Sequence, residues 1–487
     1  MPYLFAKIYM LKGEFMPKFD TKVQELRYRI LKEVAIGAFN DNLNDVIMGI
    51  QKKIVPGPKP SMRCCIYKER AIVNERLDLI LKASSKSSDN VIKVLQIACD
   101  ECPLGGYTVT DACRGCIAHR CEQSCKKDAI YFDDDQRAHI NKDKCVNCGL
   151  CAKNCPYNAI ENRVRPCEKV CKSKAISPDV NGAAKIDDSK CIQCGNCVYM
   201  CPFGAIVDDS FVLEIIDNLK NNKNKKVAII APSISGNFLD VSFEKVVSGI
   251  KKLGFDEVLE AAAGADIVAL SEGLELAEKG ELTSSCCPAF VSYIRKKYPT
   301  LVDKISHNLS PMASIAKVVK EKDQDAYVVF IGPCTAKKQE IKLDSVKKYV
   351  DSVMTFEELQ ALFDAKEIVL SELEDADMDS ASYYGRIFAK CGGLSEAVNE
   401  ALKEQGIDFV AKSVQCDGIS ACNEALLKMK MGKLDGNFIE GMACVGGCIG
   451  GPCNLTHDLR AKLGVDKYSN KAKDKTIVDS VSKTNSK

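Results

Sequence analysis

Hydrophobic positions recur with two different periods and divide the chain into a helical beginning and a mixed remainder. Residues 22–55 carry apolar positions at helical spacing, and so does YKERAIVNERLDLILKA after the breaker VPGPKPS at 55–61. From 226 to about 465, short apolar runs such as KVAIIAP and AYVVFIGP alternate with amphipathic stretches such as FEKVVSGIKKLGF. This alternation predicts strands separated by helices, and therefore an α/β domain.

Changes in composition set the expected boundaries. We expect a helical N-terminal segment at 1–98, a cysteine-rich region at 99–210, the α/β domain at 226–465 and a polar, mobile tail at 466–487. The run KNNKNKK at 220–226 is typical of a solvated linker.

The charge balance excludes several partner classes. The 68 basic and 66 acidic residues leave a net charge of +2, which gives no case for nucleic acid or an anionic membrane as partner. Apolar runs have the length of strands rather than of membrane spans, and the start, MPYLFAKIYMLKGEF, lacks a signal-peptide cleavage site. We therefore expect a cytoplasmic protein.

The 27 cysteines carry the chemical information. Sixteen of them fall between 99 and 201, many in CxxC spacing, in a chain too long and too ordinary in its apolar content for a secreted disulfide scaffold. In a cytoplasmic protein this density indicates metal binding by thiolates. With four His in the chain, His-ligated metal chemistry is disfavoured.

An internal repeat organises these cysteines. CEQSCKKDAI at 121–130 recurs as CEKVCKSKAI at 167–176, and KCVNCGLCAKNCPYNAI at 144–160 recurs as KCIQCGNCVYMCPFGAI at 190–206. The spacing CxxCxxCxxxCP is the bacterial ferredoxin run, in which three thiolates bind one cluster and the fourth reaches another. Structural zinc is the alternative, but zinc sites take cysteines in separated pairs. We therefore predict a ferredoxin-like α+β region that holds several 4Fe–4S clusters.

The number of clusters stays open between three and four, with three preferred. Twelve ligands come from the repeated units: Cys121, Cys125, Cys145, Cys148, Cys151, Cys155, Cys167, Cys171, Cys191, Cys194, Cys197 and Cys201. Four more come from two preceding pairs: Cys99, Cys102, Cys113 and Cys116. Several clusters in line conduct single electrons, so a site at one end should consume or supply them.

Three cysteine-bearing segments stand apart in the α/β region: SSCCPAF at 284–290, GPCTAKKQE at 332–340 and EGMACVGGCIGGPCN at 440–454. Each sets a cysteine beside small or turn-forming residues, where backbone can approach a cofactor closely. In this order they resemble the three signature motifs of the FeFe-type (iron-only) hydrogenases. The cysteine-rich region is similar to that family's electron relay, whereas the N-terminal segment is not covered by the resemblance.

The resemblance implies an α/β domain of the iron-only hydrogenase type with an H-cluster, a 4Fe–4S cubane joined to a two-iron unit that holds carbonyl, cyanide and azadithiolate. Cys287, Cys334, Cys444 and Cys448 match the ligands of the cubane, and Cys448 would also bridge to the two-iron unit. Cys286 matches a proton carrier that faces the azadithiolate amine. Such a cofactor also implies dedicated maturation enzymes as partners.

Glu272, Ser306 and Glu275 match the rest of the family's proton path. The two glutamates stand three apart on an expected helix, hence on one face, and without the resemblance such a pair is typical of a solvated surface. The role of Cys286 is chemically reasonable, because a thiol can donate and accept a proton and its pKa responds to its neighbours.

The resemblance also assigns residues around the two-iron unit. Lys337 matches the lysine that meets one cyanide, and Pro232 with Ser233 match the segment that meets the other, since buried anionic ligands require donors. Glu340 matches an acid that orients the second motif. Met442 matches a residue packed on the two-iron unit, although simple core packing explains a buried methionine equally well.

This chain departs from the family at several positions. Gly332, Phe290 and Met312 stand where other members have Met, Trp and Gln, and GGPCN replaces a glycine-rich run ending in Gln-Pro. Such changes tune potential and reaction bias and indicate a divergent monomeric subgroup. Six cysteines have no role in this scheme. Cys391, Cys416, Cys422 and Cys453 are expected to be buried structural thiols, and Cys64 and Cys65 stay unassigned.

The sequence as a whole predicts a ferredoxin hydrogenase that exchanges electrons with ferredoxin or a similar one-electron carrier. Two alternatives stay open. A hydrogen sensor with slow turnover is disfavoured because no signalling domain is evident. A non-catalytic iron–sulfur assembly protein of the same fold is disfavoured by Cys286 and Lys337, because a plain cubane needs neither.

Overall fold

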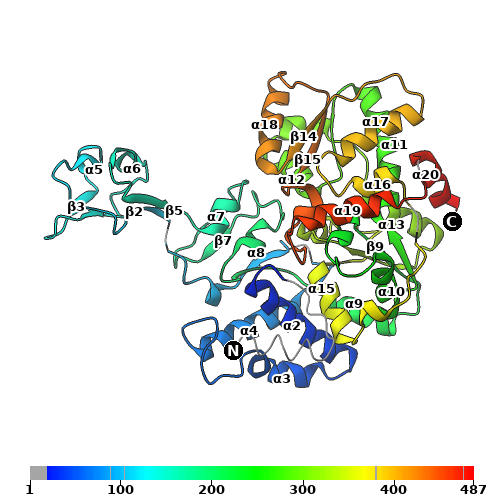
Figure 1. The fold of residues 1–487 in the computed structure, drawn as a ribbon, viewed down its shortest axis with the longest axis horizontal. Helices are drawn as coiled ribbons and strands as arrows, with labels where there is room; N and C mark the ends of the chain where they lie inside the picture. The colour runs from blue at the N-terminus through cyan, green and yellow to red at the C-terminus, as the bar shows by residue number, and fades with distance from the viewer. Residues whose placement is uncertain (1–18, 88, 104, 379–380, 475, 487) are drawn as a thin grey trace.

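The computed structural model describes residues 19–87, 89–103, 105–378, 381–474 and 476–486. Residues 1–18 of the predicted N-terminal segment lie outside the described residues. The described chain opens with three helices, α2 (Lys22–Phe39), α3 (Leu43–Ile54) and α4 (Ile66–Lys82), at the bottom of Figure 1. Thr21 caps α2, and the apolar stripes of the three helices pack into one cluster, as their helical spacing predicted.

The cysteine-rich region consists of short helices and two-stranded antiparallel sheets. Its sheets pair β1 with β8, β2 with β5, β3 with β4, and β6 with β7. The strands are β1 (Ile92–Val94), β2 (Gly106–Val109), β3 (Ile130–Phe132), β4 (Ala138–Ile140), β5 (Ile160–Arg163), β6 (Ile176–Pro178), β7 (Ala184–Ile186) and β8 (Ile206–Asp208). The helices are η1 (Gln96–Ala98), α5 (Arg120–Gln123), α6 (Leu150–Asn154), α7 (Pro166–Val170) and α8 (Asn196–Met200).

Figure 1 shows this region as two successive lobes. The lobe with α5 and α6 projects away from the rest of the chain, and the lobe with α7 and α8 lies between it and the α/β body. The chain thus sets its repeated cysteine units in line toward the α/β domain. The pairing of β1 with β8 extends this region to Ile92, a few residues before the expected boundary.

The α/β domain contains two parallel sheets. The first has the order β10 (Glu257–Glu260), β9 (Lys226–Ile230), β12 (Tyr327–Ile331) and β13 (Ser352–Met354). The second has the order β11 (Leu282–Thr283), β15 (Phe438–Met442) and β14 (Ser413–Asp417). Strands β12 and β15 are buried at every residue, as expected for parallel strands covered on both faces. The predicted α/β fold class is confirmed.

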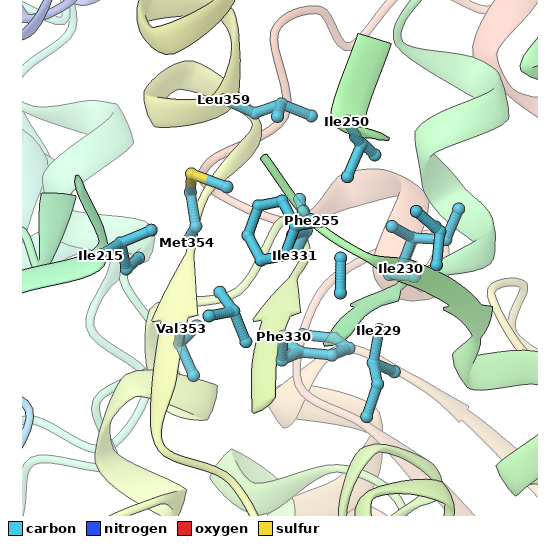
Figure 2. Close-up of a cluster of buried hydrophobic side chains, with 14 of the residues drawn as sticks. Ile215, Ile229, Ile230, Ile250, Phe255, Phe330, Ile331, Val353, Met354 and Leu359 are labelled. Carbon is cyan, nitrogen blue, oxygen red and sulfur yellow. The ribbon is translucent and has the colours of Figure 1, made fainter. Parts of the chain in front are cut away.

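Helices cover both sheets. They are α9 (Val212–Asn221), η2 (Pro232–Gly236), α10 (Phe243–Leu253), α11 (Ala261–Lys279), α12 (Pro288–Lys297), η3 (Pro299–Lys304), α13 (Pro311–Lys322), α14 (Thr335–Glu340), α15 (Phe356–Ala365), η4 (Leu370–Glu372), α16 (Tyr383–Ile387), α17 (Gly393–Glu404), α18 (Ile419–Lys430), η5 (Gly447–Gly450), α19 (Arg460–Asn470) and α20 (Ile477–Ser486). Figure 2 shows the main core, where side chains of β9, β12 and β13 meet those of α9, α10 and α15.

The C-terminal tail corrects one expectation. Its polar composition predicted a mobile segment, but α20 packs against α11 and α17. Ile477 and Ser480 are fully buried, and the Ser480 hydroxyl donates to Asp266 Oδ2 at 2.6 Å. One apolar face and one buried hydrogen bond hold a segment whose average composition is polar.

Candidate metal centre

The three cysteine motifs of the α/β domain all follow the carboxyl ends of parallel strands. Cys287 caps α12 just after β11, Cys334 caps α14 just after β12, and Cys444 and Cys448 follow β15. Ser233 follows β9 in the same manner. Because carboxyl ends of parallel strands are the usual place for a ligand in α/β folds, the topology gathers segments that are far apart in sequence.

Electrostatics locates the four sulfurs near one another. Burial, and after it the neighbouring thiols of Cys334 and Cys287, raises the pKa of Cys444 well above its ordinary value. Burial and Cys287 likewise raise the pKa of Cys334 to about 11, although Lys337 opposes this rise. Cys448 also acts on the Cys444 thiol. The four candidate ligands of the cubane therefore share one neighbourhood.

Backbone and amide hydrogen bonds fix the loop that carries Cys448. The N–H of Cys453 donates to the carbonyl of Pro333, beside Cys334, at 3.2 Å. The Asn454 side chain donates to the carbonyls of Cys448 at 3.1 Å and Ile449 at 2.8 Å. The second and third motifs are thus tied directly to each other.

The same asparagine reaches the segment after β9. Asn237 Nδ2 donates to Asn454 Oδ1 and to the carbonyl of Ser233, both at 2.8 Å. Gln24 of α2 donates to the Asn454 carbonyl at 2.6 Å. The N-terminal helices, which the resemblance leaves without a role, therefore support the third motif.

Two polar groups offer donors to an anion. Lys337 is buried and forms an ion pair of 2.6 Å with Glu340. Burial lowers the pKa of this lysine, but the Glu340 carboxylate outweighs burial and the net pKa is raised, so Lys337 stays cationic. Ser233 Oγ is also buried and has no hydrogen-bond partner among the described residues. Pro232 precedes it in η2, and Met442 is buried at the end of β15.

Cys286 lies at the inner end of a row of polar side chains. Burial, and then the Glu272 carboxylate, raises the pKa of the Cys286 thiol well above its ordinary value. Glu272 is fully buried and accepts a hydrogen bond from the N–H of Ser285 at 3.1 Å. Burial raises the pKa of Glu272 to about 7, against the effect of hydrogen bonds from Ser306 and Ser285.

The row continues outward through Ser306 to Glu275. The Ser306 hydroxyl donates to Glu275 Oε2 at 3.1 Å, so it lies between the two carboxylates. Burial would raise the pKa of Glu275, but hydrogen bonds from Lys279 and His307 outweigh it and the net pKa is lowered. The two glutamates, equivalent in the sequence pattern, are therefore a proton-holding inner group and an ionised outer group. Sequence reasoning missed Lys279 and His307, although KISHNL carries the only His near a path residue.

The sixteen cysteines of the ferredoxin-like region fall into four sets of four. Three of the sets each line a separate hollow. The first set is Cys113, Cys116, Cys121 and Cys155; the second is Cys99, Cys102, Cys167 and Cys201; and the third is Cys125, Cys145, Cys148 and Cys151. Cys171, Cys191, Cys194 and Cys197 act on one another electrostatically and form the fourth set. This grouping favours the larger of the two cluster counts that the sequence left open.

The fourth set lies next to the α/β motifs. The Thr335 hydroxyl donates to the carbonyl of Gln193 at 2.7 Å. Thr335 directly follows Cys334 in the chain, and Gln193 directly precedes Cys194. Gly195 has a φ of +75°, and a Cβ on it would come within 2.4 Å of Thr335 Oγ1, so only glycine permits this approach. Cys194 also contributes to the raised pKa of Cys444.

The donor set fits iron–sulfur clusters rather than a single ion. Among the described residues, no three His, Cys, Asp or Glu side chains are arranged to hold one metal ion. A cubane instead takes one thiolate on each of four irons, so its ligands stand farther apart. Four thiols per set, together with the cation of Lys337 and the free hydroxyl of Ser233, fit clusters and an anionic cofactor.

The departures from the family lie in the packing around this centre. Phe290 is fully buried against Gly441, where a Cβ would come within 2.2 Å of the ring. Met312 is buried in the main core. Cys416, Cys422 and Cys453 are buried, as expected for structural thiols, and Cys64, to which the sequence assigned no role, is exposed. Cys391 and Cys65 are partly exposed, and Cys65 caps α4.

Comparison with known families agrees with this geometry. Residues 224–452 match the family described as iron only hydrogenase large subunit, C-terminal domain, and residues 138–161 and 184–207 match the 4Fe-4S binding domain. Among the described residues, no helix is long and apolar enough to cross a membrane.

The chain is similar both to hydrogenases and to iron–sulfur cluster assembly factors. The chain is 26% identical to Iron hydrogenase 1 of Clostridium pasteurianum over 49% of this chain and 52% of that protein, so it spans about half of that relative's length. It is 29% identical to the Periplasmic (Fe) hydrogenase large subunit of Nitratidesulfovibrio vulgaris over 68% of this chain and 88% of that protein. It is also 24% identical to a probable cytosolic Fe-S cluster assembly factor of Culex quinquefasciatus, over 44% of this chain and 57% of that protein.

Proposed function

We propose, from the premise that residues 224–452 belong to the iron-only hydrogenase large-subunit family and follow 4Fe-4S binding domains, that this protein is a hydrogenase. It would interconvert two protons and two electrons with H2. The electrons would pass through the 4Fe–4S clusters to or from ferredoxin or a similar one-electron carrier.

The observation that carries this proposal is the row from Cys286 to the surface. A partly buried thiol, a fully buried carboxyl with a pKa of about 7, a hydroxyl and a largely buried carboxylate follow one another beside four clustered cysteines. A protein that only stores or transfers an iron–sulfur cluster has no need of such a row. An enzyme that moves protons through a dry interior does.

Four thiolates would hold the cubane of the cofactor: Cys287, Cys334, Cys444 and Cys448. Lys337 and Ser233, next to Pro232, would donate to its cyanides, and Met442 would pack against it. Glu340 keeps Lys337 charged and oriented through their ion pair. When bound, the two-iron unit supplies the centre at which protons and electrons combine.

The protein's own residues would deliver the protons. Because its pKa is raised, Cys286 holds its proton at neutral pH and can give it up only to an adjacent acceptor. Glu272, with a pKa of about 7, can restore that proton and take another through Ser306. Ser306 can donate to either glutamate by rotating its hydroxyl, and Glu275 connects the row to the surface.

Electrons would follow the four cysteine sets. The set with Cys171, Cys191, Cys194 and Cys197 is the one that contacts the α/β motifs, through Thr335 and Gln193. The set with Cys125, Cys145, Cys148 and Cys151 lies in the projecting lobe, where Cys148 is exposed and a carrier could approach.

A second candidate function is iron–sulfur cluster assembly, which the similarity to the Culex assembly factor favours. Cys286 and Lys337 speak against it, because a single cubane requires neither a proton carrier nor a buried cation. A hydrogen sensor with slow turnover would share the cofactor and differ only in rate.

One experiment separates these functions. The protein is produced together with H-cluster maturation enzymes, and its infrared spectrum is recorded. Cyanide and carbonyl stretches are expected for a hydrogenase or a sensor, and their absence would favour cluster assembly. Fast H2 evolution with reduced ferredoxin is then expected, whereas bands with only slow turnover would favour the sensor.

A further inference from the structure

The proton row ends at the surface where Glu275 meets His307 and Lys279, two residues that the family resemblance did not assign. Glu275 accepts from the backbone N–H of His307 at 3.0 Å and lies 2.6 Å from the His307 ring through its other oxygen. Lys279 Nζ lies 2.7 Å from Glu275 Oε1 and 2.9 Å from His307 Nδ1. The side chain of Glu275 is only 13% exposed, whereas that of His307 is 75% exposed. Solvent therefore reaches the ring far more readily than it reaches the carboxylate.

We propose that His307 is the surface proton-exchange group of this row: its imidazole takes protons from solvent and passes them to Glu275, or carries them outward in the reverse direction. This inference rests on the proposed hydrogenase function. It adds a residue beyond the thiol, carboxylates and hydroxyl already assigned.

The geometry at Nδ1 suits a relay because both protonation states find a partner. When Nδ1 carries a proton, the N–H donates to Glu275 Oε1 at 2.6 Å. When Nδ1 has lost that proton, its lone pair accepts from the Lys279 ammonium at 2.9 Å. The other ring nitrogen, Nε2, forms no hydrogen bond with the described residues and is free to exchange with water.

Each proton transfer along this route conserves protons and returns the ring to its neutral form. A buffer acid or hydronium ion protonates the neutral ring at Nε2, and the imidazolium gives its Nδ1 proton to the Glu275 carboxylate. One proton has then moved from solvent to a neutral Glu275 carboxyl, and the ring is neutral again. Rotation of the exposed ring, which is fast for surface side chains, presents the unprotonated nitrogen to solvent once more.

Charges around the cluster explain why Glu275 needs such a partner. Hydrogen bonds from Lys279 and His307 outweigh burial and lower the pKa of Glu275, so this carboxylate alone binds a proton poorly near neutral pH. The imidazole beside it has two nitrogens, so it can take a proton at one and give a proton from the other. Glu278 is exposed on the same helix, and Lys304, three residues before His307, pairs with Glu281 at 3.2 Å.

The test compares matured wild-type protein with His307→Gln and with His139→Gln. Gln keeps a polar side chain but cannot carry a proton. His139 is a matched control, because it is also exposed and pairs with a carboxylate, Asp133 at 2.7 Å, in the projecting lobe. H2 evolution is measured across the neutral pH range, and the infrared bands confirm equal cofactor content.

We expect His307→Gln to evolve H2 about tenfold more slowly at neutral pH and above, less than the ~100-fold loss of a buried acid–base group because water still reaches Glu275. Free imidazole in the buffer should restore most of the rate, and His139→Gln should equal wild type. A merely structural ion pair would show no such chemical rescue.

A second measurement does not depend on turnover. In the unmatured protein, whose four histidines are readily distinguished by NMR, Glu275→Gln should change the ring signals of His307 and leave those of His139 unchanged. An active wild type with an unaffected His307→Gln, or with a slowed variant that imidazole does not rescue, overturns the relay. A wild type without infrared bands or turnover overturns the proposed function instead, and the relay with it.

Discussion

Above its raised pKa Glu272 carries an unfavourable buried charge, so replacing it with glutamine should stabilise the fold at alkaline pH. The side chain is fully buried in α11, and burial raises its pKa from 4.5 to about 7. Glutamine keeps an oxygen that can accept from the N–H of Ser285. The second oxygen, Oε2, has no partner among the described residues, and the Ser306 hydroxyl beside this carboxyl, which donates to Glu275, can accept from an amide nitrogen.

The magnitude follows from linkage between protonation and folding. Between pH 4.5 and 7 the folded chain holds a proton on Glu272 that the unfolded chain has lost, so stability falls as pH rises through this range. At about 1.4 kcal/mol per pH unit, the full cost above pH 7 is about 3 kcal/mol. Glu272→Gln should therefore match wild type below the unfolded pKa and exceed its stability by about 3 kcal/mol above the folded pKa.

Chemical denaturation of the unmatured proteins at a series of pH values measures this difference. Asp266 is also buried and has a pKa raised to about 7, but it contributes equally to both proteins and cancels. Glu278 lies exposed on the same helix, so Glu278→Gln is a matched control and should change stability little at any pH. A stability difference between Glu272→Gln and wild type that does not depend on pH would refute the reasoning.

Three further predictions test other parts of the structure. Cys286→Ala should lower H2 evolution by about 100-fold or more with the infrared bands retained, and undiminished turnover would remove the thiol from the proton path. Cys113→Ser should lower the iron content by about four atoms per chain, because it removes a ligand of one cluster. Cys64→Ser, at an exposed cysteine outside the four sets, should leave the iron content unchanged. Equal iron content in the two variants would mean that this region holds three clusters rather than four. Lys338→Met removes the cation shared by Asp208 at 2.8 Å and Glu358 at 2.9 Å. It should lower the free energy of unfolding, measured by denaturant titration, by about 3–5 kcal/mol. Lys347→Met, at an exposed ion pair, should change this free energy little, and equal effects of the two substitutions would contradict the prediction.

Local sequence patterns predicted the elements that depend on near neighbours. The apolar stripes of α2 and α4 and the buried runs of β9 and β12 follow from helical and strand spacing within single segments. The ferredoxin runs could also be recognised from the sequence, because the ligand spacing of a cluster is set within one short loop. The packing of the C-terminal tail was not predicted, because its composition is polar on average and only a few positions, such as Ile477, become buried.

Contacts between residues far apart in the chain could not be predicted from local sequence patterns. Glu272 and Glu275 are alike in the helical pattern, yet one is fully buried and the other reaches Lys279 and His307. That difference arises only when residues 305–308 pack against α11, and it gives the two carboxylates opposite pKa directions. The support of the Cys448 loop by Asn237 and Gln24 is likewise a contact between distant segments.

The sequence by itself determined which residue types and loops this protein has for holding iron, because each cysteine run is a local pattern. Only the tertiary structure decided which thiols share a set, that the strand ends bring Cys287, Cys334, Cys444 and Cys448 together, and that polar groups line up from Cys286 to the surface. Burial and charge depend on every element packed around a side chain, and those elements are assembled by the fold and not by neighbours in the chain.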